Sequence, residues 1–350
     1  MNHKKRNYVI GVAVVLLGLG LFVLCRGQSV GNSGFDQNGK VGMETGEKGG
    51  KKTKGKGTES GGSNKVESGE EGQTETGKAE KEANVPEQSR GNHNENSRTD
   101  EGESEAQKKE RVIVEDTNYD AIDNTLYSWW FKRNDNHEKS GCQDDFDISE
   151  FDAHYTVPVS EKKIYITFDC GYENGYTADI LDTLKEEQVP AAFFVTQTYI
   201  RDNINLVKRM KEEGHLVCNH TVTHPTMPSK SVEEQKKELL TCEQYMKETT
   251  GYDMDLFFRP PKGEYSKRTL QMAKDLGYTT VFWSMAYLDY DVNNQPSSDH
   301  VVEHFKKYYH PGAIPLLHNV SVANRDALSR VLKNLKKEGY GFGTLYELKE

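Results

Sequence analysis

Three predicted helices of this chain each end in a glycine that leads directly into an apolar run. The junctions are Glu213-Gly214-His215, Leu276-Gly277-Tyr278 and Glu338-Gly339-Tyr340. Glycine adopts the positive φ that the residue after a helix often needs, so each junction predicts a helix followed at once by a strand. Helices that alternate with buried strands in this way predict an α/β fold built on a parallel sheet.

The spacing of apolar residues predicts the order of the elements. Short apolar runs predict strands over 163–168, 191–196, 215–219, 256–258, 279–283, 313–317 and 342–345. Helical spacing predicts helices over 177–187, 203–213, 231–249, 266–276, 300–308 and 325–337. Ser231 followed by Glu234 has the pattern of a capping box at the start of the third helix.

Residues 8–25 form an uninterrupted apolar run. About 20 residues of helix cross a bilayer, so this run is long enough for a membrane anchor. Lys4, Lys5 and Arg6 precede it, which places residues 1–7 in the cytoplasm and the rest of the chain outside. A cleaved signal peptide is the alternative, but its apolar region is usually about 7–15 residues, and no Ala-x-Ala-like site follows here. We expect a retained single-pass anchor.

Residues 26–110 have the composition of a disordered linker, because residues 36–110 contain no Phe, Tyr, Trp, Leu or Ile. Such a segment cannot bury enough apolar surface to offset the loss of chain entropy. Roughly 80 flexible residues span about 50 Å on average, enough to carry a domain away from a membrane. The basic patch at 49–57 lacks interleaved aromatic residues, so we expect no nucleic-acid partner.

Residues 111–350 hold nearly all the aromatic side chains and are numerous enough for one sizeable core. The alternating pattern begins at residue 163, so we expect 163–350 to be the main domain and 111–162 to be an N-terminal extension that packs against it. Four cysteines lie here without a CxxC pattern, which excludes a disulfide framework as the main source of stability.

Side chains that can do chemistry follow the expected strands. They are Asp169, His220, Arg259, Asp289 and His318. In a barrel of βα units the carboxyl ends of the strands meet at one face, where the active site lies. We therefore expect these side chains to lie close together.

His220 and His224 are four residues apart, a spacing at which two imidazoles can bind one metal ion. Pro225 follows at once and disfavours a continuing helix, so we expect a loop or a first helical turn. Taken alone, Asp169 has a simpler interpretation as a helix N-cap, and His318 as a hydrogen-bonded core histidine. Together these residues predict metal-assisted hydrolysis.

Four stretches resemble the motifs of one known family, the polysaccharide deacetylases with a NodB homology domain, carbohydrate esterase family 4. They are Thr167-Phe168-Asp169-Cys170, His220-Thr221-Val222-Thr223-His224, Arg259-Pro260-Pro261-Lys262-Gly263 and Leu316-Leu317-His318. The resemblance covers about residues 163–348. It implies a distorted (β/α)7-8 barrel that hydrolyses the amide bond of N-acetylated sugars with the help of a divalent metal.

The resemblance also implies a role for each residue of the site. Asp169 is the general base, Arg259 orients it, and His318 is the general acid. His220 and His224 are metal ligands. Zinc is the expected ion, and cobalt, manganese and magnesium are the alternatives.

Two positions depart from the motifs of the family. Cys170 stands where the family has an Asp that is the third metal ligand, and Ala286 stands where it has an Asp that tunes the catalytic histidine. Cys170 is either a soft ligand for zinc or a small residue packed in place of the ligand. Asp289 is the nearest remaining acidic residue, and we expect it to orient His318.

Three residues are expected on the substrate side. By resemblance, the backbone N–H of Lys262 holds the oxyanion. Its side chain is a candidate partner for the lactyl carboxylate of a muramic acid that has lost its peptide. A further motif of the family reads Ala286-Tyr287-Leu288-Asp289-Tyr290 here. Trp283, shortly before it, and Asp289, within it, complete this side of the site.

Residues 129–133, 167–176 and 282–286 resemble a subgroup, the delta-lactam-biosynthetic de-N-acetylases of the spore cortex. This implies that the partner is the peptidoglycan glycan strand after an amidase has acted. The enzyme is then a membrane protein of sporulation whose catalytic domain lies in the wall or on the intermembrane side of the forespore. Two alternatives stay open: a generic N-acetylglucosamine deacetylase of the wall, and an inactive glycan-binding module.

Overall fold

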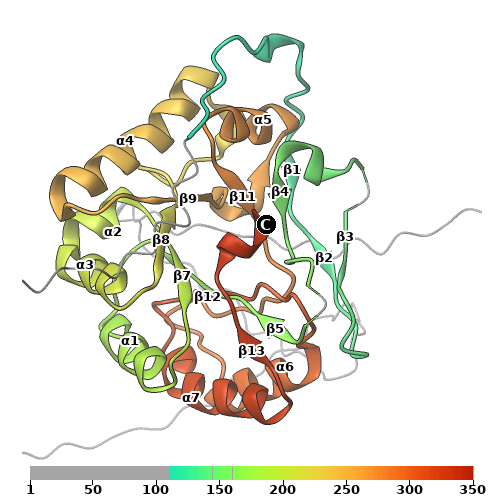
Figure 1. Cartoon of the computed structure of the whole chain (residues 1–350), viewed down its shortest axis with the longest axis vertical. Helices are drawn as coiled ribbons and strands as arrows, with labels where there is room; N and C mark the ends of the chain where they lie inside the picture. The colour runs from blue at the N-terminus through green and yellow to red at the C-terminus, as the bar shows by residue number, and fades with distance from the viewer. Residues whose placement is uncertain (1–110, 144, 160, 350) are drawn as a thin grey trace, which may run out of the picture. The chain divides into compact units, whose positions relative to one another are not determined.

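In the computed structural model, which describes residues 111–143, 145–159 and 161–349, a curled sheet of seven parallel strands lies at the centre (Figure 1). In order across the sheet they are β12 (Leu316–His318), β6 (Ile166–Cys170), β7 (Ala191–Val195), β8 (Leu216–Asn219), β9 (Asp255–Phe258), β11 (Thr279–Val281) and β4 (Ala153–His154). Every neighbouring pair is parallel. The parallel α/β fold expected from the helix–glycine–strand junctions is confirmed.

The sheet is a curled half-barrel rather than a closed ring of seven or eight strands. Its two edges are β12 and β4. The chain that follows β11 bends back toward β12, where the Ser284 N–H donates to the Ile314 carbonyl at 2.9 Å and the Leu316 N–H donates to the Met285 carbonyl at 2.8 Å. These bonds bring the two sides of the sheet together without a continuous ladder.

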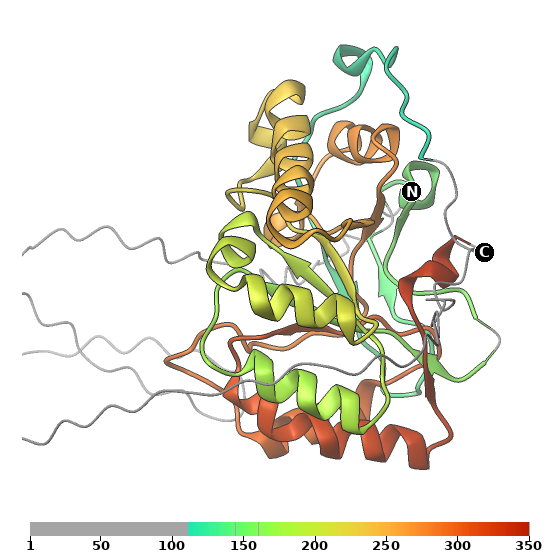
Figure 2. The same ribbon diagram turned by 60° about the vertical axis from the view of Figure 1, so that its left-hand side comes forward.

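Helices cover the outer face of the curled sheet (Figures 1 and 2). They are α1 (Thr177–Glu186), α2 (Gln197–Asp202), α3 (Ile204–Glu212), α4 (Val232–Thr250), α5 (Lys267–Asp275), α6 (Ser298–Tyr308) and α7 (Val322–Lys337). The glycines that predicted the junctions have positive φ, 82° at Gly214, 78° at Gly277 and 81° at Gly339. The capping box of Ser231 and Glu234 starts α4 as expected.

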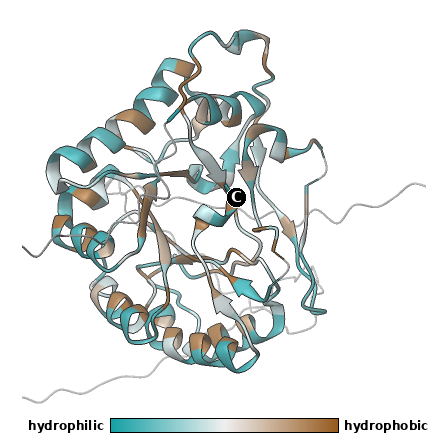
Figure 3. Ribbon diagram, viewed as in Figure 1, coloured by the Kyte–Doolittle hydropathy of each residue, from teal (hydrophilic) through white to brown (hydrophobic). Residues whose placement is uncertain are grey.

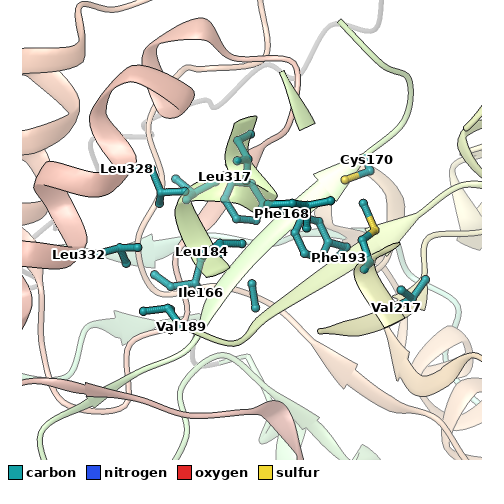
Figure 4. Close-up of a cluster of buried hydrophobic side chains, with 14 of the residues drawn as sticks. Ile166, Phe168, Cys170, Leu184, Val189, Phe193, Val217, Leu317, Leu328 and Leu332 are labelled. Atoms are coloured by element: carbon teal, nitrogen blue, oxygen red, sulfur yellow. The ribbon is translucent and has the colours of Figure 1, made fainter. Parts of the chain in front are cut away.

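The inner strands are buried on both faces. Successive side chains point to opposite faces of the sheet, and every residue of β6 and β7 is buried. In β6, Phe168 points outward into a core formed with Leu184 of α1 and with Leu328 and Leu332 of α7 (Figure 4). Phe194 of β7 belongs to a second cluster on the opposite, inner face. Apolar colour therefore concentrates on the central strands, and the helices alternate between apolar and polar positions (Figure 3).

The ends of the expected strand pattern differ from the structure. The predicted strand 163–168 is divided into β5 (Lys163–Ile164) and β6, because the chain changes partners at Tyr165, whose N–H donates to the Ala313 carbonyl. The last expected strand is only β13 (Gly341–Phe342), and it pairs with β5 outside the main sheet. The apolar residues that follow it form a 3-10 turn, Leu345–Leu348.

The N-terminal extension is part of the sheet. It contributes β4 beside β11, and β1 (Tyr127–Ser128) pairs antiparallel with β10 (Glu264–Tyr265). A hairpin of β2 (Phe131–Lys132) and β3 (Gly141–Cys142) lies between β1 and β4 in the sequence. The Trp129 ring stacks on Phe282 with centroids 4.4 Å apart. The extension thus completes the edge of the barrel beside the third motif.

The predicted anchor at 8–25 and linker at 26–110 lie outside the described residues. Among the helices that the structure does describe, none is both long and apolar enough to cross a membrane.

Candidate active site

The carboxyl ends of the parallel strands bring the predicted chemical residues to one place. Asp169 is near the end of β6 and His318 is the last residue of β12, and the two are register partners. His220 follows β8, and Arg259 follows β9. Asp289 lies in the loop between β11 and α6 and reaches His318 from there.

Arg259 and Asp169 form a buried ion pair. Arg259 Nη1 lies 2.7 Å from Asp169 Oδ1, and the arginine side chain is fully buried. Its guanidinium also donates to the carbonyls of Val281 at 3.0 Å and Phe282 at 3.4 Å, and it stacks over the ring of Phe194. Burial alone would raise the pKa of this carboxyl, but the charges of Arg259, His220 and His318 together hold the pKa of Asp169 below its usual value. Asp169 is therefore kept ionised and fixed in direction.

The two histidines lie on a loop, as Pro225 predicted. His220 Nδ1 is 2.8 Å from the Arg259 carbonyl, so this nitrogen carries the proton and Nε2 keeps a free lone pair. The imidazole of His224 lies 4.8 Å away, centroid to centroid. Glu238 of α4 holds the loop between the histidines through the N–H groups of Val222 and Thr223.

Burial lowers the pKa of both imidazoles, for His224 to about 3, so both are neutral at pH 7. Neutral imidazole is the form that binds metals. His224 Nδ1 is buried without a hydrogen-bond partner in the described part of the chain, which a bound ion would satisfy. The described residues contain no group of three or more His, Cys, Asp and Glu side chains arranged to hold a metal. The pair therefore fits a divalent ion as two ligands, with water or substrate completing the site.

Cys170 is not placed beside these ligands. It alternates with Asp169 along β6 and lies in the outer core cluster near Phe168, Phe193 and Val217 (Figure 4). Its side chain is fully buried, and burial raises the pKa of the thiol well above its ordinary value. Because the thiolate is the form that binds zinc, the structure favours the second of the two interpretations, in which Cys170 is a small packed residue.

His318 has a carboxylate partner despite the alanine at position 286. Its Nδ1 lies 2.7 Å from Asp289 Oδ1, and its backbone N–H donates to Asp289 Oδ2 at 2.8 Å. Burial by itself would lower the pKa of this imidazole, but the carboxylates of Asp289 and Asp169 together raise the pKa of His318. Asp289 thus bonds to both the ring and the backbone of His318.

Lys262 lies within the third motif, and Trp283 packs against it. Lys262 has a left-handed backbone, φ 61°, and its Nζ lies 3.2 Å from Thr226 Oγ1. The Trp283 ring packs against Gly263, where an added Cβ would come within 2.8 Å of it. A glycine is therefore needed next to Lys262. Trp283 also lies 5.8 Å from the Arg259 guanidinium, measured to its ring centroid.

Sequence reasoning missed a polar cluster behind the site. Glu173 accepts hydrogen bonds from Thr177, Tyr199 and Asn319, the residue after His318. Asn319 also donates to the Tyr172 carbonyl at 3.0 Å. These bonds join the loop after β6 to the loop after β12. The Gly-Tyr-Glu-Asn-Gly-Tyr stretch was visible in the sequence, but its spacing alone does not reveal the partner after His318.

Comparisons with known proteins find relatives of this chain among the deacetylases. Residues 156–281 match the family model described as polysaccharide deacetylase. The peptidoglycan-N-acetylmuramic acid deacetylase PdaA of Bacillus subtilis is 42% identical over 231 residues, which are 65% of this chain and 88% of the relative. A peptidoglycan-N-acetylglucosamine deacetylase of Bacillus cereus is 36% identical over 197 residues, 55% of this chain and 91% of the relative.

A solved structure is also similar. Bacillus subtilis PdaA, described as a family 4 carbohydrate esterase, superposes with a TM-score of 0.63 at 41% sequence identity. The match covers 65% of this chain and 98% of the solved one. The similarity therefore extends over nearly the whole of that solved chain.

Proposed function

The chain belongs to the polysaccharide deacetylase family, and on that premise we propose that it removes the acetyl group from N-acetylmuramic acid in peptidoglycan. One observation carries the proposal. A carboxylate held by an arginine and an imidazole held by a carboxylate face each other across β6 and β12, beside a pair of neutral histidines. This is the arrangement that amide hydrolysis needs, with a base, an acid and a place for a metal.

Asp169 acts as the general base. Its Oδ1 is occupied by Arg259, which leaves Oδ2 to accept the proton of the attacking water. Arg259 keeps the carboxylate ionised and prevents it from rotating. His220 and His224 would hold a divalent ion, which would supply Lewis acidity for the acetyl carbonyl and for the attacking water. Zinc is the ion proposed first.

His318 acts as the general acid. An amine is a poor leaving group unless it is protonated, so the sugar nitrogen must receive a proton as the C–N bond breaks. The Nδ1–H of His318 bonds to Asp289. The imidazole therefore gives its other proton, the one on Nε2, to the sugar nitrogen. The raised pKa of His318 keeps the imidazole charged at higher pH than a free histidine.

The choice of muramic acid is supported by the relatives and by Lys262. The relative at 42% identity is named for N-acetylmuramic acid, and the Bacillus cereus relative at 36% is named for N-acetylglucosamine. Muramic acid differs from glucosamine by a lactyl group, which ends in a free carboxylate once the peptide is gone. Lys262 places a half-buried cation within the third motif, where it can bind that carboxylate.

The same proposal gives the protein a place of action. Residues 8–25 anchor it in the cell membrane, and residues 26–110 carry the catalytic domain into the wall or the intermembrane space of the forespore. It acts after an amidase and prepares muramic acid for closure to the delta-lactam of the spore cortex. These statements rest on the sequence pattern and the subgroup resemblance.

Two other functions are the alternatives. A generic N-acetylglucosamine deacetylase is favoured by the Bacillus cereus relative. An inactive glycan-binding module is disfavoured. Glycan binding alone would need neither the two ion pairs of Asp169 and His318 nor the pair of histidines, and the structure contains all of them.

Product analysis tests the substrate. Peptidoglycan stripped of peptides is incubated with the full chain and zinc, digested to disaccharides and analysed by tandem mass spectrometry. The acetyl loss should lie on the muramic acid residue. In Lys262→Met the preference for stripped over intact glycan should fall, whereas Lys237→Met, at an exposed lysine of α4, should keep it. Acetyl loss from glucosamine alone would contradict the proposal.

A further inference from the structure

We propose that Asn324 is a positioning residue for the reaction, and that its side-chain amide holds the Asp289 carboxylate in the one orientation that aims the His318 imidazole. The inference rests on the proposed role of His318 as the acid. Asn324 lies in the first turn of α7, outside every motif that the sequence resemblance identified. It does not contact the reacting atoms and acts only through Asp289.

The contacts of Asp289 show why a further residue is needed. Its Oδ1 accepts from His318 Nδ1 at 2.7 Å. Its Oδ2 accepts from the His318 backbone N–H at 2.8 Å and from Asn324 Nδ2 at 2.7 Å. Asp289 is 1% exposed and Asn324 is 2% exposed, so water does not replace a lost donor. Two of the three bonds come from His318 itself, and Asn324 supplies the only side-chain donor to Oδ2 among the described residues.

The orientation of the Asn324 amide follows from its two neighbours. An ionised carboxylate accepts hydrogen bonds only, so the NH2 group must face Asp289. The carbonyl oxygen then faces the Tyr287 hydroxyl, which donates to Asn324 Oδ1 at 2.6 Å. Asn324 Nδ2 also donates to the His318 carbonyl at 3.1 Å. Each end of the amide thus has the partner that its chemistry requires.

The backbone around Asn324 is fixed to the loop that carries Asp289. Ser321 caps α7 by accepting from the Asn324 N–H at 3.2 Å, and its hydroxyl also bonds to Gln295 Oε1. Gln295 Nε2 donates to the Asp289 carbonyl at 2.7 Å. The start of α7 and the loop before α6 are therefore held together on both sides of the carboxylate.

The carboxylate that meets the histidine comes from Asp289, three residues after Ala286 in the loop. The charged and titratable groups that face His318 are Asp289, Asp169, Arg259, His220, His224 and Tyr290, whose ring meets the imidazole edge-on. Of these, only Asp289 bonds to the imidazole in the described structure, so the direction of the ring depends on that one carboxylate.

Substitutions of equal shape test the proposal in the full-length protein. Asn324→Asp keeps the shape but replaces the NH2 donor by an oxygen, and Asn324→Leu keeps the approximate volume without either polar group. Asn334→Asp, at an exposed position of the same helix, is the matched control. The readouts are kcat on peptide-stripped peptidoglycan and the tautomer of the neutral His318 ring, measured from the 15N shifts of its two nitrogens at a pH above its pKa.

Both Asn324 variants should lose roughly tenfold or more in kcat with little change in KM, the size expected when a hydrogen bond to a charged group is lost. His318 should no longer be held in the Nδ1–H tautomer. Tyr287→Phe keeps the fold and removes only the donor to Asn324 Oδ1, so it should give a smaller loss in the same direction. The control should match the wild type in both readouts.

The proposal is overturned if His318 keeps its single tautomer and kcat in the two Asn324 variants. It is also overturned if Asn324→Asp retains both while only Asn324→Leu loses them, because the role of Asn324 would then be packing. If the wild-type chain releases no acetate, the proposed function fails. The tautomer measurement still decides the role of Asn324 in that case.

Discussion

His318 lies directly opposite Asp169 in the parallel ladder of β12 and β6, and each is held by a charged partner from a different part of the chain. The ladder sets the spacing between them, and the partners set their protonation. Arg259 favours the ionised carboxylate, and Asp289 favours the charged imidazole. Each partner therefore favours the protonation state that the proposed role of its residue requires.

Replacing Asp289 by Asn should lower the activity at high pH first. The pKa of His318 is raised by Asp289, and the acid must be protonated to act. Activity is thus lost as pH rises through this pKa, and removing the carboxylate moves the loss to lower pH. A pH profile of kcat checks this, with the acidic side expected to stay in place. An unchanged basic side would show that Asp289 does not control the acid.

Replacing Arg259 by Met should act on the opposite side of the profile. Asp169 must be ionised, and Arg259 lowers its pKa, so the acidic side of the profile should move to higher pH. The variant also leaves a buried carboxylate without its partner, which costs about 3–5 kcal/mol of unfolding free energy. Urea denaturation and a pH profile measure the two effects. A variant with wild-type stability would contradict the buried pair.

Removing the Cys170 thiol should leave metal binding intact. Cys170→Ala should lose about 1–2 kcal/mol of stability, as is usual when a core side chain is shortened. Cys242→Ala, in the same core cluster, is the matched control and should behave alike. Zinc affinity, measured by isothermal titration, should be the same in both variants. A loss of zinc affinity in Cys170→Ala alone would restore Cys170 as a ligand.

His304 should make the fold sensitive to acid. Burial lowers its pKa to about 3, and its Nε2 is buried without a partner in the described structure. Since the pKa of an unfolded histidine is about 6.5, the unfolded chain binds more protons once the pH falls below that value. The cost reaches about 2 kcal/mol at pH 5.

His304→Phe should remove that part of the pH dependence, so its loss of stability between pH 7 and pH 5 should be smaller than that of the wild type. His300→Phe, at an exposed position one turn earlier on α6, should keep the wild-type dependence. Denaturation at the two pH values provides the comparison. Equal pH dependence in both variants would rule out His304 as a source of acid sensitivity.

The order of strands and helices followed from local patterns. Glycines after helices and runs of buried residues are short-range features, and they located most of the sheet. The edge strands were harder to predict, because they are defined by pairing with strands that are distant in the sequence. Nothing in Ala153–His154 indicates that it joins β11, and nothing at residue 341 indicates that it leaves the main sheet for β5.

The site was predicted as far as its motifs reached. Asp169, Arg259, His220, His224 and His318 could be named because strand ends meet in such folds. The supporting residues could not be named, because Asn324 and Glu173 contact partners that are distant from them in the sequence. The sequence also left open whether the Cys170 side chain faces the site or the core, because this depends on which side chains of β6 point to the inner face of the sheet.

Acetate release tests the central claim most directly. The full chain is incubated with peptidoglycan stripped of its stem peptides by an amidase, and with intact peptidoglycan, each with zinc and with a chelator. The account predicts release from the stripped glycan only, and only with metal. Equal release from both glycans would indicate a generic wall deacetylase. No release with any divalent metal would contradict the enzyme altogether and favour the glycan-binding module.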